Sequence, residues 1–266
     1  MTDRRVSDRV REITVECHHD GSVARKTDRV ALEEPLEMRL SGTPLAVVMR
    51  TPGDDDHLVT GFLLTEGILL APDEISALER LDDSRIDVRL REGIDVDPSR
   101  FQRNLFMSSS CGVCGKAAIE AVQIFARPAK PFTVRRKVLR GLTAELRTQQ
   151  PTFDATGGLH AAGLFDLKGR AIVVHEDVGR HNAVDKAIGA AAVAHWPLPP
   201  SLLVVSGRQS FEIVQKAAVA GIGGVVGVSA PSSLAVELAD GLDMLLVGFS
   251  RDPSYNVYAG HGHLAD

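Results

Sequence analysis

The second half of the chain alternates short apolar runs with helical patterns. Apolar residues recur at helical spacing near 182–194, 210–220 and 232–240, between successive apolar runs. We expect those runs to be the strands 171–174, 202–205, 225–229 and 244–248. Strand-helix repeats form largely parallel sheets with right-handed crossovers, and strands buried on both faces do not alternate apolar with polar residues. The sequence therefore predicts an α/β sheet, mostly parallel, in this half.

The first hundred residues have shorter and more varied patterns. Alternating apolar positions over 36–40 predict a strand, and 45–49 returns after a Ser41-Gly42 turn as its hairpin partner. A helix is expected over 57–64, after aspartates that can cap it, and a further strand over 86–90. This mixture predicts a smaller α+β region ahead of the sheet.

A break near residue 130 separates the two halves. Pro128 and Pro131 stand between one helical segment, 116–126, and the next, 136–146, and proline interrupts helices. The expected domains are 1–130, an N-terminal α+β region, and 131–266, an α/β domain.

Composition excludes several classes of protein. With 266 residues of which 44% are hydrophobic, the chain can fill a core. The 30 Lys and Arg against 35 Asp and Glu give a net charge of −5, so the global basic excess of a non-specific nucleic-acid binder is missing. No apolar run approaches membrane-spanning length. Three cysteines are too few for a disulfide framework. We expect a soluble cytoplasmic protein without nucleic-acid or membrane partners.

Arginines follow three of the four expected strands. Arg180, Arg208 and Arg251 lie in loops that also carry glycine and serine. In an open α/β sheet, ligands bind beyond the carboxyl ends of the strands. Glycine allows close approach of a ligand to the backbone, and arginine donates two fixed hydrogen bonds to phosphate oxygens. These loops indicate a phosphate-bearing small molecule. The alternative is that the arginines form surface salt bridges with neighbouring carboxylates.

A Cys-x-x-Cys motif, Cys111 and Cys114, precedes the helix expected from Lys116. A helix N-terminus and a nearby lysine both stabilise a thiolate, which lowers the pKa of a cysteine there. The favoured interpretation is a thiolate on a loop that accepts a sulfur atom and hands it on.

Two other uses of the cysteine pair remain open. A zinc site needs four ligands, and only Cys17 or histidines could complete one here. A thioredoxin-like redox pair would follow a strand directly, whereas Ser108 to Ser110 precede this motif. Zinc-dependent base deaminases are disfavoured, because His175-Glu176 has no spacer and no proline precedes Cys111.

Several blocks of the sequence, in one order, resemble the formate dehydrogenase accessory sulfurtransferase family (FdhD). The resemblance runs almost end to end. The matching blocks are 33–37, 49–55, 61–67, the Cys111 loop, 156–160, 176–186, 206–208, 229–233 and 248–249.

The resemblance implies a function, partners and site residues. A member of this family accepts persulfide sulfur from a cysteine desulfurase and passes it to the molybdenum bis-guanine-dinucleotide cofactor, which is bound as a substrate, for formate dehydrogenase. It implies that Cys111 carries the persulfide and that Cys114 is its partner, with no metal site of the protein's own. It also implies a homodimer and a cytidine-deaminase-like three-layer sandwich. The cofactor-binding stretch would be Phe249, Ser250, Arg251, Asp252, Pro253 and Ser254, beside Arg208 and Arg180.

The sequence also departs from the family pattern. Asp252 and Ser254 stand where a proline and a second arginine are expected, His175 stands where arginine is more common, and the tail 258–266 is unlike the usual ending. A second class of function stays open, in which the protein is a non-enzymatic chaperone that binds the cofactor while its cysteines form a redox or zinc pair.

Overall fold

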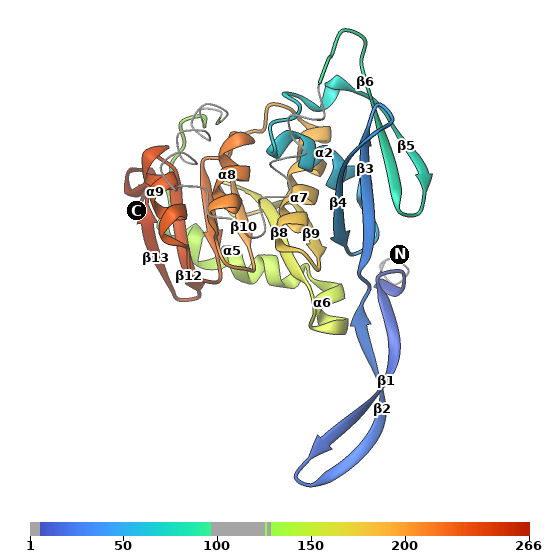
Figure 1. Cartoon of the computed structure of the whole chain (residues 1–266). Helices are drawn as coiled ribbons and strands as arrows, with labels where there is room; N and C mark the ends of the chain where they lie inside the picture. Colours follow the sequence, from blue (N-terminus) through green and yellow to red (C-terminus); the bar gives the residue numbers. More distant parts are fainter. Residues whose placement is uncertain (1–5, 97–125, 127–128) are drawn as a thin grey trace.

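A computed structural model of the chain describes residues 6–96, 126 and 129–266. Figure 1 shows a body of sheets and helices with a long two-stranded arm that extends from it. Cys111 and Cys114 lie outside the described residues, as do residues 116–125 of the helix expected after them.

The central element is a six-stranded sheet in the order β13-β12-β11-β10-β8-β9. Its strands are β8 (His160–Asp166), β9 (Ala171–Asp177), β10 (Ser201–Val205), β11 (Gly224–Gly227), β12 (Leu245–Arg251) and β13 (Ser254–Ala259). The four strands expected in this half correspond to β9 to β12. The pairs β10–β11 and β11–β12 are parallel, so the expectation of parallel strands is confirmed at the centre of the sheet.

The prediction of a mostly parallel sheet is wrong at its margins. β8 pairs antiparallel with both β9 and β10, and β13 pairs antiparallel with β12. The connections explain the difference, because β8–β9 and β12–β13 are joined by short turns. A short turn can join only antiparallel strands, whereas parallel strands need a longer crossover.

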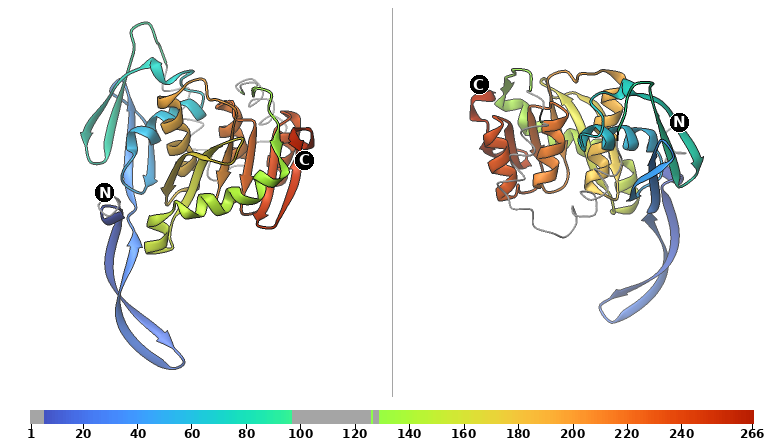
Figure 2. Two further views of the ribbon diagram at one scale, coloured as in Figure 1. Left: turned by 180° about the vertical axis from the view of Figure 1, so that it is seen from behind. Right: turned by 45° about the horizontal axis from the view of Figure 1, so that its top comes forward.

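Helices cover both faces of this sheet and give three layers. On one face lies α5 (Arg136–Thr148), and on the other lie α7 (Arg180–Ala194), α8 (Phe211–Val219) and α9 (Ser233–Gly241), as the two views of Figure 2 show. Within β10, Leu202 and Val204 join the hydrophobic cluster beneath α5, whereas Leu203 and Val205 join the cluster on the opposite face. Burial on both faces explains the continuous apolar run. The likeness to cytidine deaminase stays a prediction.

A second sheet, in the order β4-β3-β6-β5, flanks the helices. Its strands are β3 (Glu34–Leu40), β4 (Thr43–Arg50), β5 (Ile75–Asp82) and β6 (Arg85–Leu90), and α2 (Asp55–Thr65) follows β4. The strands β3, β4 and β6 and the helix α2 were expected from the sequence, whereas β5 was not.

The helices α2 and α7 pack very closely. A Cβ at Gly61 would overlap the carbonyl oxygen of Asp185, and one at Gly189 would overlap that of His57. One hydrophobic cluster runs from β3, β6 and α2 through α7 to the large sheet. The division into domains at residue 130 stays a prediction.

The arm consists of β1 (Val10–His19) and β2 (Ser22–Ala31), an antiparallel pair that contacts α6 near its base. Cys17 lies on β1 as a free, half-buried thiol. The remaining short elements are η1 (Pro72–Glu74), β7 (Val134–Arg135), α6 (Pro151–Thr156), η2 (His261–His263) and β14 (Leu264–Ala265), and β14 pairs with β7. Among the described residues, none of the helices combines the length and the apolar character needed to cross a membrane.

Candidate functional site

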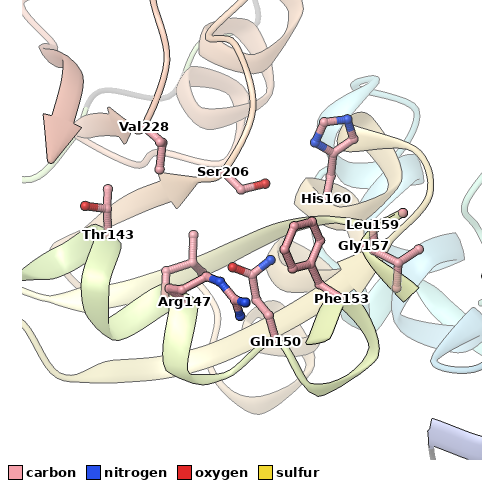
Figure 3. Close-up of a pocket in the computed structure, with 11 residues that line it drawn as sticks. Thr143, Arg147, Gln150, Phe153, Gly157, Leu159, His160, Ser206 and Val228 are labelled. Atoms are coloured by element: carbon pink, nitrogen blue, oxygen red, sulfur yellow. The ribbon is translucent and has the colours of Figure 1, made fainter. Parts of the chain in front are cut away.

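A cavity of about 470 Å³ opens at the carboxyl edge of the parallel strands. Ser206 follows β10 and Val228 follows β11, and both line it. This edge is where open α/β sheets bind their ligands, and the volume lies in the range of small-molecule pockets. The other lining residues are Thr143, Leu146, Arg147, Gln150, Phe153, Gly157, Gly158, Leu159 and His160. Figure 3 shows Arg147, Gln150 and Phe153 reaching from the helical side toward Ser206 and His160.

The helix α5 forms one wall of the cavity because its apolar residues recur at helical spacing. Leu139, Leu142 and Leu146 are buried against the sheet. This orientation leaves Thr143 and Arg147 beside the cavity. The wall therefore combines an apolar base with a hydroxyl and an exposed guanidinium.

The helix α6 forms the adjoining wall and is fixed by a buried carboxylate. Glu176, at the end of β9, accepts hydrogen bonds from the backbone N–H groups of Thr152 (2.9 Å) and Phe153 (2.7 Å). Pro151 occupies the first helical turn, where its missing N–H costs nothing. A carboxylate at a helix N-terminus meets both free N–H groups and the positive end of the helix dipole. Glu176 thus holds the Phe153 ring in the cavity wall.

His160 opens β8 and lines the cavity from the sheet side. Burial, together with the charge of Arg180, lowers the pKa of His160 below its ordinary value of 6.5. Gly207 lies close to it, since a Cβ there would be 3.4 Å from His160 Nδ1. The imidazole is therefore neutral at pH 7 and can accept a proton from a bound group.

The three predicted arginines lie at the same edge of the sheet. Arg180 begins α7, Arg208 follows β10, and Arg251 ends β12. Among the residues that the structure describes, none of the three forms an ion pair, and Arg180 Nε is buried without a hydrogen-bond partner. Asp177, one of the carboxylates nearest in sequence, pairs with Lys186 instead. The guanidinium groups thus keep donors available for a ligand.

The predicted cofactor stretch, residues 249–254, forms the end of β12 and the turn into β13. Ser250 is fully buried: its Oγ donates to the carbonyl of Leu139 (3.3 Å), and its own carbonyl accepts from Thr143 Oγ1 (2.8 Å). Its side chain therefore fastens this hairpin to α5. Arg251, Asp252, Pro253 and Ser254 are exposed, and Phe249 is 43% exposed.

A buried ion pair supports the start of α7. Lys186 and Asp177 are both inaccessible, with Nζ and Oδ2 2.7 Å apart. Lys186 Nζ also donates to the carbonyl of Thr51 (2.8 Å), and Asn182 Nδ2 donates to Asp177 Oδ1 (3.0 Å). Burial lowers the pKa of Lys186, although Asp177 opposes the shift. This pair fixes the loop that ends at Arg180.

A second buried cluster joins α2, α7 and α8. Lys216 Nζ contacts carboxylate oxygens of Asp185 (3.0 Å) and Glu66 (2.8 Å), and Thr65 Oγ1 donates to Asp185 (2.7 Å). Burial raises the pKa of Asp185 to about 6. Burial alone would lower the pKa of Lys216, but its two carboxylates outweigh it and raise that pKa.

His175 contacts Asp54. His175 Nδ1 lies 3.2 Å from Asp54 Oδ2, and Arg9 pairs with the same carboxylate. The hydrogen bond to His175 and the nearby positive charges hold the pKa of Asp54 well below its usual range. Asp54 thus lies between His175 and Arg9.

The cavity wall made by Thr143, Arg147, Gln150 and Phe153 was not predicted as part of the site. These residues come from α5 and α6, and only their folded arrangement brings them to the strand ends. The one local signal was the break at Gln150-Pro151, directly after a strongly amphipathic helix.

Comparisons with known proteins agree along the chain. The model of the FdhD/NarQ family matches residues 31–265. The "Sulfur carrier protein FdhD" of Streptomyces avermitilis is 46% identical over all of this chain and 96% of its own length. Its namesake from Mycobacterium tuberculosis is 46% identical over 89% of this chain and 91% of its own length.

A solved structure has the same overall fold. A crystal structure of a formate dehydrogenase accessory protein from Desulfotalea psychrophila superposes with a TM-score of 0.78 at 25% identity, covering 96% of this chain and 99% of its own. The family match spans most of the chain, and the curated relatives align over nearly its whole length. The chain therefore belongs to the FdhD/NarQ family.

Proposed function

We propose that this protein is a sulfur carrier that accepts persulfide sulfur from a cysteine desulfurase and transfers it to the molybdenum bis-guanine-dinucleotide cofactor for formate dehydrogenase. The observation that carries the proposal is the alignment of a "Sulfur carrier protein FdhD" over the whole chain. The sequence supplies the thiol chemistry through Cys111 and Cys114. In this role the protein is a sulfurtransferase that works in the cytoplasm.

Sulfur uptake is a thiol exchange. The Cys111 thiolate attacks the terminal sulfur of the desulfurase persulfide, the sulfur-sulfur bond on the desulfurase breaks, and its cysteine leaves as a thiolate that takes a proton from water. Cys111 then carries the persulfide. Exposure and a lowered thiol pKa favour such an attack.

Sulfur release uses the second cysteine. The Cys114 thiolate attacks the inner sulfur of the Cys111 persulfide, forms the Cys111–Cys114 disulfide and expels the terminal sulfur as hydrosulfide, which the cofactor's metal receives. The transferred sulfur is reduced while the two thiols are oxidised. A cellular dithiol reductant then restores the cysteine pair.

The cavity supports the binding of one end of the dinucleotide. Phe153 and Leu146 offer apolar surface, and the neutral His160 can exchange a hydrogen bond or a proton with a bound group. Arg180 and Arg208 keep donors available for phosphate oxygens. The protein's part is to orient the cofactor, and the cofactor's metal is the acceptor of the sulfur.

A homodimer is part of the proposal. The arm β1–β2 contacts its own chain near its base and exposes Ile13, Val23 and Val30. A lone two-stranded ribbon is marginally stable in water. A second copy that covers the arm would stabilise it.

Intact mass after incubation with a cysteine desulfurase and cysteine tests the carrier function. We expect the wild type to gain the mass of one sulfur atom, Cys111→Ala to gain none, and Cys114→Ala to keep the added sulfur without releasing it. A wild type that neither gains sulfur nor forms the Cys111–Cys114 disulfide while the desulfurase turns over would contradict the proposal, and so would a Cys114→Ala variant that gains no sulfur.

The second candidate function, a cofactor-binding chaperone, is favoured by the cavity and the unpaired arginines. It predicts guanosine diphosphate binding with no sulfur gain in the same experiment. The two functions therefore separate on a single mass measurement.

A further inference from the structure

Four basic side chains gather at the start of α5. We call Arg135, Arg136, Lys137 and Arg140 the α5 basic face. All four are exposed, and only Arg136 has a carboxylate partner, the fully exposed Asp266 at 3.4 Å. Within the described part of the chain, the other three form no ion pair. The group stands out because the chain as a whole carries a net charge of −5.

These charges oppose the stability of the helix that carries them. The N-terminus of a helix bears a positive partial charge, so cations there are unfavourable and carboxylates favourable. The first turn of α5 contains Arg136 and Lys137 and no acidic residue, and Arg135 at the N-cap makes no capping hydrogen bond. Natural proteins break such local rules mainly at functional sites, so these basic residues favour a binding role.

Packing does not require the basic residues either. The sheet-facing side of α5 is complete, with Leu139, Leu142 and Leu146 almost wholly buried. Lys137 and Arg140 lie on the exposed side. Figure 2 shows α5 running along the outside of the sheet, where another molecule can reach it.

The α5 basic face and one wall of the cavity belong to the same helix. Thr143, Leu146 and Arg147, on the same helix, line the cavity, and none of the four basic residues does. Thr143 also holds the hairpin at Ser250, which leads to the exposed Arg251. A surface that docks on the basic face is therefore placed beside the cavity without filling it.

We propose that the α5 basic face docks a carboxylate-rich surface of the formate dehydrogenase polypeptide that receives the cofactor. The inference rests on the proposed function, in which the cofactor leaves from the cavity. In that function the dehydrogenase must approach the cavity to take the cofactor. Complementary charge speeds such encounters and makes them sensitive to salt.

The experiment measures binding of the full-length protein to cofactor-free formate dehydrogenase by biolayer interferometry at low and raised salt. In Lys137→Glu/Arg140→Glu we expect the affinity to fall by about tenfold or more and the salt dependence to weaken. The matched control is Arg85→Glu/Arg91→Glu at the two ends of β6, because these two side chains are also exposed and belong neither to the cavity lining nor to the arm. It makes the same change in net charge and should bind as the wild type does.

Two further readouts separate this inference from the proposed function. Sulfur gain at Cys111 and guanosine diphosphate affinity should both be unchanged in Lys137→Glu/Arg140→Glu. Where the glutamates impair folding, judged by thermal unfolding, Lys137→Gln/Arg140→Gln replaces them.

Wild-type affinity for the dehydrogenase in both α5 variants would overturn the inference, and so would an equal loss in the Arg85→Glu/Arg91→Glu control. Loss of guanosine diphosphate binding would overturn it as well, because the basic face would then hold the nucleotide. Normal sulfur gain in any of these cases leaves the proposed function standing.

Discussion

The helices α5 and α7 cover opposite faces of one sheet and carry charge in opposite ways. On α7, Asp185 and Lys186 are buried, and each contacts an oppositely charged side chain. On α5, Lys137 and Arg140 are exposed and without an ion pair among the described residues. A buried charge must be paired, whereas an exposed one is solvated at little cost. The comparison indicates that Asp185 and Lys186 on α7 maintain the fold and that Lys137 and Arg140 on α5 are free to bind.

Removal of one partner of the α7 ion pair should have the largest effect on stability. Lys186→Met leaves the Asp177 carboxylate buried without its cation, which costs about 3–5 kcal/mol of unfolding free energy. Urea denaturation followed by circular dichroism measures the loss.

Two controls sharpen this prediction. Lys137→Met on α5 should change the unfolding free energy by less than about 0.5 kcal/mol. The double variant Asp177→Asn/Lys186→Met should recover part of the loss, because no uncompensated charge remains. Equal losses of unfolding free energy in Lys186→Met and Lys137→Met would contradict the contrast between a buried, paired charge on α7 and an exposed charge on α5.

Acid should destabilise the α7 side through His181. Burial, with the charges of Lys216 and Arg180, lowers the pKa of His181 to about 4 from 6.5, while Glu212 and Glu66 oppose the shift. Between those values the unfolded chain binds a proton that the folded chain does not. Stability is therefore lost as the pH falls from 6.5 to 4, by roughly 3 kcal/mol from this group.

The His181→Gln variant isolates this effect. The raised pKa of Asp185 gives the opposite trend over part of the same window, so the quantity to compare is the difference between wild type and variant. We expect the advantage of the wild type over the variant to shrink steadily from pH 7 to pH 4 in urea titrations. If the unfolding free energies of wild type and variant change in parallel with pH, His181 has the same pKa in the folded and the unfolded chain, which contradicts the prediction.

Glycine-to-alanine substitutions on the two helices should change the free energy of unfolding by smaller amounts and with opposite sign. In Gly189→Ala the new Cβ meets the backbone of α2, so α2 and α7 must separate at a cost of about 1–3 kcal/mol. In Gly141→Ala on α5 the new Cβ meets nothing within 4 Å, and the helix should gain about 0.5–1 kcal/mol. Thermal unfolding of both variants measures these changes in stability. Destabilisation by Gly141→Ala would contradict the expectation that α5 has open space beside Gly141.

The sequence predicted those elements whose own residues carry a local signal. A helix was expected over 136–146, and α5 (Arg136–Thr148) is found there, with Leu139, Leu142 and Leu146 buried at helical spacing. The apolar run 202–205 became β10, which is buried on both faces. Such patterns determine an element, whatever its neighbours are.

Local sequence patterns could not predict features that depend on residues far apart in the chain. The environment of the buried pair Asp177–Lys186 depends on Thr51, which lies 126 and 135 residues before them in the chain. The antiparallel direction of β8 depends on its partner strands. The cavity exists only where α5, α6 and two strand ends meet, so no local pattern predicted that its helical wall lies beside Ser206 and His160.

The proposed sulfur-carrier function can be tested by following labelled sulfur from cysteine to the bound cofactor. The protein would be loaded with radioactive sulfur by a cysteine desulfurase, mixed with the molybdenum bis-guanine-dinucleotide cofactor, and separated from it. We expect the cofactor to carry label after incubation with the wild type and to carry none after incubation with Cys111→Ala. In the Arg208→Ala variant, Cys111 should still take up sulfur, but its transfer to the cofactor should be slower. Label that reaches the cofactor equally from Cys111→Ala, or that never leaves the wild type, would contradict the proposed function.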